Sequence, residues 1–177
     1  MKKFDFKKYR GSCFNQMDTM STSCRLRSWW TCLGIFVDQD KVFDTINDFN
    51  IQDYIPKYQR SNDKWSMDMK EKFISNLLKG VKTSIILVRY NEHEDAMILD
   101  GQQRLTAIQD FMLDKILVDG FKYSEIKEDV KKLSINFGFH ILTAKDEQEA
   151  IQFYIDMNEN ITHSKEDINK AKKLLNR

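Results

Sequence analysis

The chain has 177 residues, which is enough for one domain with a full hydrophobic core. A hydrophobic content of 41%, a charged content of 31% and a single proline are ordinary for a globular protein and argue against a disordered chain. The net charge of +1 excludes a strong basic field over the whole surface. Basic residues nevertheless outnumber acidic ones near the N-terminus. The acidic residues there are Asp5 and Asp18, and the basic ones are Lys2, Lys3, Lys7, Lys8, Arg10, Arg25 and Arg27. This basic segment either contacts nucleic acid or is simply solvated.

The cysteines show no metal-binding pattern, because none makes a C-x-x-C pair and no histidine lies near Cys13, Cys24 or Cys32. We therefore expect reduced thiols. An odd number of cysteines without a secretion signal indicates a reducing compartment, so the predicted location is cytoplasmic. No apolar run approaches the length of a transmembrane helix, and no membrane partner is expected.

The first 40 residues are interpreted as an N-terminal extension without an assigned structure. Within it, Trp29–Val37 is strongly apolar, and its two tryptophans either belong to the core or form a platform on which bases stack. Lys41–Phe49 predicts a short helix, because its apolar residues fall on one side. Pro56 then fixes an extended stretch, so we expect a strand end or loop to present the next few side chains.

Clearer helix and strand patterns follow. Ser66 is a good N-cap for a helix that ends at Leu78, and Gly80 is a suitable stop. The predicted strands are Thr83–Tyr90, Ala96–Leu99 and Ser134–Leu142. The other predicted helices begin near Gln102, Tyr123, Asp146 and Ser164. Strands that are separated by helices indicate a mixed α/β fold.

The most informative stretch joins the strand that ends at Leu99 to the next helix. Asp100 and Gly101 are turn residues, and Gln102, Gln103 and Arg104 open the helix. A helix start carries unpaired N–H groups and a positive dipole end, both of which attract anions. Glycine lets a phosphate come close, and the arginine guanidinium suits phosphate oxygens. The stretch therefore predicts a phosphate-binding turn at a helix N-terminus.

A second polar cluster, Tyr58, Gln59 and Arg60, also follows an extended segment and also combines glutamine with arginine. Two arginines and a helix start around one pocket would suit a triphosphate. Asp100 would then hold a divalent cation or orient a water molecule. In the alternative, purely structural interpretation, Asp100 caps the helix and Arg104 pairs with an acid on the surface.

Several ordered motifs resemble one known family. They are Ile55–Arg60 followed by Trp65, then Phe73–Gly80, Ile98–Ile108, and Phe153–Asn160 followed by Ser164–Ala171. Together they resemble the N-terminal domain family of GmrSD-type modification-dependent restriction systems, whose fold is similar to the ParB/sulfiredoxin fold. The resemblance spans roughly residues 40–177. It divides the chain into a mildly basic extension, residues 1–40, and a nucleotide-binding domain, residues 41–177.

The resemblance implies an α/β (α+β) domain in which helices flank a small mixed sheet. It also implies that the domain binds and hydrolyses a nucleoside triphosphate, with Mg²⁺, in a reaction coupled to modified DNA. The catalytic residues carried over from the motif are Asp100, Gln103 and Arg104, and Asp100 is the candidate Mg²⁺ ligand. The implied phosphate-binding residues are Tyr58, Gln59, Arg60, Gly101, Gln102, Gln103, Arg104 and Thr106.

This sequence departs from the family in length, because it ends at Arg177 and we expect no HNH nuclease domain. A short, Lys- and Asn-rich standalone copy resembles a phage or mobile-element protein. Two other functions remain open. The same site could transfer a phosphoryl group to a hydroxylated DNA base or a protein hydroxyl. Alternatively, the chain could be a non-catalytic binding or inhibitor module that uses its basic segment.

Overall fold

The computed structural model describes residues 20–59, 64–90, 95–158 and 165–175. The described strands are β1 (Met20–Arg25), β2 (Ser84–Arg89), β3 (Met97–Asp100) and β4 (Asn136–Thr143). The described α-helices are α2 (Trp29–Val37), α3 (Met67–Leu78), α4 (Gln102–Met112), α5 (Tyr123–Lys132), α6 (Glu147–Asn158) and α7 (Lys165–Leu175). In these parts of the chain, no helix is long and apolar enough to cross a membrane.

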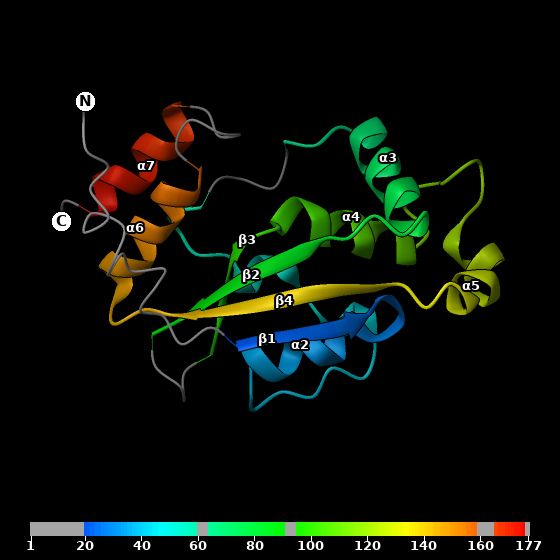
Figure 1. The fold of residues 1–177 in the computed structure, drawn as a ribbon, viewed down its shortest axis with the longest axis horizontal. Helices are drawn as coiled ribbons and strands as arrows, with labels where there is room; N and C mark the ends of the chain where they lie inside the picture. The colour runs from blue at the N-terminus through cyan, green and yellow to red at the C-terminus, as the bar shows by residue number, and fades with distance from the viewer. Residues whose placement is uncertain (1–19, 60–63, 91–94, 159–164, 176–177) are drawn as a thin grey trace, which may run out of the picture.

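The four strands form one mixed sheet in the order β1-β4-β2-β3 (Figure 1). β4 pairs antiparallel with β1 and parallel with β2, and β2 pairs antiparallel with β3. β3 therefore ends at the edge of the sheet, where the chain turns directly into α4. The predicted fold, a small mixed sheet flanked by helices, is confirmed.

The two faces of the sheet are covered differently. Alternate residues of β4, such as Phe137 and Phe139, are buried in a large core with residues of α2, α3 and α4. A second core joins α6 and α7 to one end of the opposite face, through residues such as Val88 and Leu142. In Figure 1, α6 and α7 lie at the left end of the strands. The other end of that face carries polar side chains, which we describe below.

Residues 20–37 belong to the folded core. β1 is an edge strand of the sheet, and Trp29 at the start of α2 is fully buried, in contact with Phe49 at a ring-centroid distance of 5.2 Å. The interpretation of this apolar stretch as core is confirmed. The predicted N-terminal extension, residues 1–40, thus includes an edge strand and a core helix, and residues 1–19 lie outside the described residues.

The predicted helix over Lys41–Phe49 is wrong. The segment contains a single short 3-10 turn, Ile46–Asp48. At its start, Thr45 donates two hydrogen bonds to the Asp48 carboxylate, from its backbone N and from its Oγ1. Phe43 and Phe49 are both buried, with ring centroids 4.9 Å apart. These two aromatic anchors draw the segment into the core as a loop, so packing outweighs the weak helical pattern.

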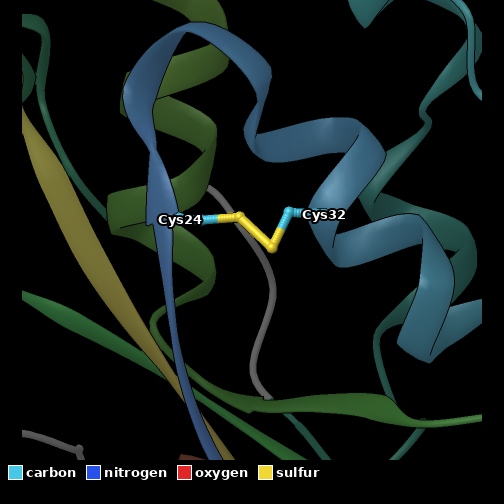
Figure 2. Close-up of a disulfide and its surroundings, with 2 residues drawn as sticks. All are labelled: Cys24 and Cys32. Atoms are coloured by element: carbon cyan, nitrogen blue, oxygen red, sulfur yellow. A yellow bond between two sulfur atoms is a disulfide. The ribbon is translucent and has the colours of Figure 1, made fainter.

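The expectation of reduced thiols is wrong for two of the cysteines. Cys24 in β1 and Cys32 in α2 form a disulfide, with Cα atoms 6.3 Å apart (Figure 2). The spacing of eight residues places one cysteine on the strand and the other on the helix that packs against it. The bond therefore ties the edge strand to the core helix. Cys13 lies outside the described residues.

Candidate functional site

The turn between β3 and α4 is built around Gly101. This residue is the N-cap of α4 and has a φ of +97°, a conformation that residues with a side chain rarely adopt. A Cβ atom added here would lie 2.6 Å from Cδ1 of Ile85 and 3.3 Å from its Cα. The first helical hydrogen bond runs from Leu105 N to Gly101 O at 2.9 Å. The turn thus requires glycine both for its backbone conformation and for its space.

The start of α4 is buried, and its N-cap residue Gly101 has no side chain with which to cap it. No side chain in the described part of the chain caps it, and no acidic residue lies in its first turn. Arg104 is the charged residue of that turn. Its guanidinium pairs with the Asp100 carboxylate, and its Nη1 lies 3.4 Å from Thr83 Oγ1. Asp100 therefore does not cap the helix. The partner of Arg104 is Asp100 of the same motif rather than a separate acid on the surface. Both findings differ from the purely structural interpretation of this turn.

Two glutamines at the start of α4 are buried, but their amides differ in hydrogen bonding. Gln103 Oε1 accepts a hydrogen bond from Trp65 N at 3.2 Å, which links α4 to the segment before α3. Gln102 is 5% exposed, and within the described residues neither of its amide atoms has a hydrogen-bond partner. An unpaired buried amide costs about 1–3 kcal/mol. The Gln102 amide is therefore a candidate contact for a bound ligand.

The second polar cluster reaches the same turn through Gln59. Its Nε2 donates to Ile98 O at 3.1 Å and to Leu99 O at 2.6 Å, at the end of β3. Gln59 is buried, and its Oε1 has no hydrogen-bond partner among the described residues. The structure thus brings Gln59 together with the Asp100–Arg104 motif. Arg60 lies outside the described residues.

Lys170 of α7 is a neighbour that the sequence did not indicate. Its Nζ donates to the backbone oxygen of Gln59 at 3.0 Å, across 111 residues of chain. A lysine on a polar helix carries no local signal of such a contact. The final helix therefore adds a positive charge beside the loop that holds Gln59.

The remaining predicted site residues lie further from solvent or further along the helix. Tyr58 is 1% exposed and packs against Tyr154 in the second core, with ring centroids 5.6 Å apart. Burial raises the pKa of the Tyr58 hydroxyl, which is neutral at physiological pH. Thr106 is half-buried in α4. The phosphate-binding roles of these two residues remain predictions.

A magnesium ion at this site would depend on Asp100. In the described part of the chain, no three His, Cys, Asp or Glu residues gather closely enough to form a metal cage. Mg²⁺ commonly binds through one or two carboxylates, with substrate phosphates and water as its other ligands. The Asp100 carboxylate is half-buried at the end of β3, directly before Gly101. It could therefore bind Mg²⁺ as the single protein ligand, with phosphate oxygens and water completing the coordination.

One of three comparisons with known proteins found a match. Comparison with curated proteins found no match, and comparison with solved structures found none either. The family model described as the GmrSD restriction endonuclease, N-terminal domain, matches residues 41–177. That range contains both polar clusters, α4 and α7, whereas β1 and α2 precede it. The chain belongs to the family of GmrSD restriction endonuclease N-terminal domains.

Proposed function

We propose that this domain binds a nucleoside triphosphate at the start of α4 and hydrolyses its terminal phosphate. One observation carries the proposal: among the described residues, no side chain caps the helix start and the buried Gln102 amide has no hydrogen-bond partner, while Arg104 lies in the first turn. A helix N-terminus with free donors, a positive dipole end and an arginine is suited to phosphate groups. These features together favour a phosphate ligand over a purely structural helix start.

Each residue of the turn has a distinct role in this proposal. Gly101 supplies the left-handed turn that begins α4, and the unpaired backbone N–H groups of that helix start would hold phosphate oxygens. Arg104 places positive charge at the terminal phosphate, and its contact with Asp100 fixes the orientation of the guanidinium. Gln102 donates a hydrogen bond to a phosphate oxygen. When bound, Mg²⁺ would neutralise phosphate charge beside Asp100.

Hydrolysis requires a water molecule in line with the leaving group. The water oxygen forms a bond to the terminal phosphorus, and the bond from that phosphorus to the bridging oxygen breaks. The products are a nucleoside diphosphate and inorganic phosphate, and the water proton passes to solvent. We assign the orientation of the water to Asp100, the carboxylate nearest to the phosphate-binding turn, because positioning accounts for much of the catalysis of phosphoryl transfer.

The biological target that we propose is modified DNA. The family is described as the N-terminal domain of a restriction endonuclease, and restriction systems distinguish one form of DNA from another. Nucleotide hydrolysis would then act as a switch that accompanies this discrimination. The proposal concerns the activity of this domain and requires no nuclease chemistry from residues 41–177.

Nucleotide turnover by the full chain tests the proposal. We expect phosphate release from at least one nucleoside triphosphate, and a fall of about 100-fold or more in Arg104→Gln and in Asp100→Asn. The control is Asp110→Asn. This change also breaks an ion pair of α4, the 2.6 Å contact with Lys70, but it lies away from the turn. The control should retain turnover.

Three outcomes would contradict the proposal. The first is a parent protein that releases no phosphate from any nucleoside triphosphate, with or without modified DNA. The second is equal turnover in the parent and both site variants. The third is an equal loss in Asp110→Asn, which would make the ion pairs of α4 a folding requirement only. If the nucleotide is labelled on its terminal phosphate and the label appears on a hydroxyl acceptor, the reaction is phosphoryl transfer and not hydrolysis.

A further inference from the structure

The part of the sheet face that α6 and α7 leave uncovered contains a cavity of about 550 Å³. In Figure 1, no helix is drawn in front of the right-hand part of β1, β4 and β2. Apart from Phe137, the side chains that line the cavity are polar or charged: Ser23 from β1, Asn136 and His140 from β4, Ser84 from β2, and Lys82, Thr83 and Arg104. We call this surface the open face.

Small residues at paired positions make the open face accessible. Ser23 and Ser84 both pair with Gly138, so three strands present small residues side by side. Next to them, His140 Nδ1 lies 2.8 Å from Ser21 Oγ. A sheet face that is exposed to water carries polar side chains. Here these side chains are short, so they leave a hollow with hydroxyl groups on its floor that can accommodate a polar ligand.

The charge around the open face is positive. Arg25, Arg27 and Lys82 are exposed, and none forms an ion pair with a residue that the structure describes. The acids nearby are already engaged, because Asp100 pairs with Arg104 and Glu128 pairs with Lys131 at 2.6 Å. Three unpaired cations on one surface contrast with the net charge of +1 for the whole chain.

These cations are spread across the sheet rather than gathered at one point. Arg25 is opposite Asn136 in the register of β1 and β4, so it borders the cavity. Beyond the end of these strands, a second, smaller hollow is lined by Arg25, Arg27 and Lys131. Lys82 lies on the other side, just before β2. The positive charge thus forms a strip across three adjacent strands, which are about 4.8 Å apart.

We propose that this strip binds the phosphate backbone of a nucleic acid strand. A row of separated cations with hydroxyl groups between them suits several phosphates in sequence, whereas a single nucleotide needs its charges gathered around one point. The inference rests on the DNA-directed part of the proposed function. It adds a place for the DNA: the strip borders Arg104, so the nucleic acid and the nucleotide would meet at the start of α4.

The strip also resolves the two interpretations of the basic N-terminal segment. Arg25 and Arg27, two of its seven basic residues, hold fixed positions beside the open face. Solvation alone would not require their alignment with Lys82, which is distant in sequence. Contact with nucleic acid is therefore the better interpretation for these two residues.

Binding of labelled duplex and single-stranded oligonucleotides to the full chain, without any nucleotide, tests the inference. The variant Arg25→Gln/Arg27→Gln/Lys82→Gln should bind at least about ten-fold more weakly at moderate salt. The slope of the logarithm of affinity against the logarithm of salt concentration should fall by about 2 to 3. Because phosphate contacts carry no sequence information, modified and unmodified DNA should lose affinity equally.

The control removes the same charge elsewhere. Lys41→Gln/Lys145→Gln/Lys173→Gln changes three exposed lysines outside the strip and should keep the affinity and salt slope of the parent. The inference is overturned if the strip variant binds like the parent, if both triple variants weaken equally, or if the folded parent binds no oligonucleotide. The readout does not depend on phosphate release, so failure of nucleotide hydrolysis would be seen separately.

Discussion

Two helices that pack against each other, α3 and α4, begin in opposite ways. At α3, the Ser66 side chain accepts a hydrogen bond from Met69 N at 3.3 Å, and Asp68 lies in the first turn. At α4, Gly101 offers no side chain, and Arg104 occupies the first turn. Acids stabilise a helix start through the helix dipole, whereas a cation there is unfavourable. The start of α3 is thus arranged for stability, whereas that of α4 lacks this arrangement, as the proposed phosphate site requires.

The difference is local, because the two helices share one core. Lys70 of α3 and Asp110 of α4 form a half-buried ion pair at 2.6 Å, and residues such as Ile74 and Ile108 are fully buried in the same cluster. The surroundings of the two helix starts differ, because Ser66–Met69 is exposed whereas Gly101, Gln102 and Gln103 are buried. The cap of α3 lies in water and the uncapped start of α4 lies inside the protein, and substitutions at the two helix starts separate stability from ligand binding.

The largest effect on folding is expected for Gly101→Ala. A side chain at φ +97° is strained, and its Cβ would lie 2.6 Å from Cδ1 and 3.3 Å from Cα of Ile85, so we expect a loss of about 2–4 kcal/mol in the free energy of unfolding. The matched control is Gly80→Ala after α3, where φ is +90° but nothing lies within 4 Å. This change should cost about 1–2 kcal/mol. Urea unfolding measures both, and equal losses would mean that the space around Gly101 is not limiting.

The next effect concerns binding rather than folding. Gln102→Met keeps the length of the side chain but removes an amide that has no partner, so stability should stay level or rise by about 1 kcal/mol. Nucleotide affinity should fall about ten-fold, or about 1.4 kcal/mol, in a fluorescence or calorimetric titration.

Gln109→Met on the same helix provides the opposite case. The Gln109 amide donates to Ile46 O at 3.3 Å and to Phe49 O at 2.7 Å, so its loss should destabilise the fold by about 1–3 kcal/mol and leave nucleotide affinity unchanged. A Gln102→Met protein that is less stable but binds nucleotide like the parent would show that the buried amide serves the fold.

Local patterns in the sequence predicted most of the elements around the site. The Ser66 cap and the β-branched run of β2 were sufficient for α3 and β2, and the turn at Gly101 was placed correctly between β3 and α4. β1 was missed because Met20–Arg25 is mostly polar, and its exposed residues meet partners far along the chain, such as His140, 119 residues from Ser21. The contact of Lys170 with Gln59 was missed for the same reason: tertiary contacts leave no periodic signal.

The smallest effect is expected at the capped helix. Ser66→Ala removes the acceptor for Met69 N and should cost about 1 kcal/mol of unfolding free energy. Ser66→Asp restores an acceptor and adds a charge that the helix dipole favours, so it should remain within about 0.5 kcal/mol of the parent. Neither change should alter nucleotide turnover, because the cap faces no phosphate in the proposed mechanism. If Ser66→Asp is as unstable as Ser66→Ala, the start of α3 is not stabilised by its cap. If either variant slows turnover, the start of α3 also serves catalysis, and the proposed contrast with α4 fails.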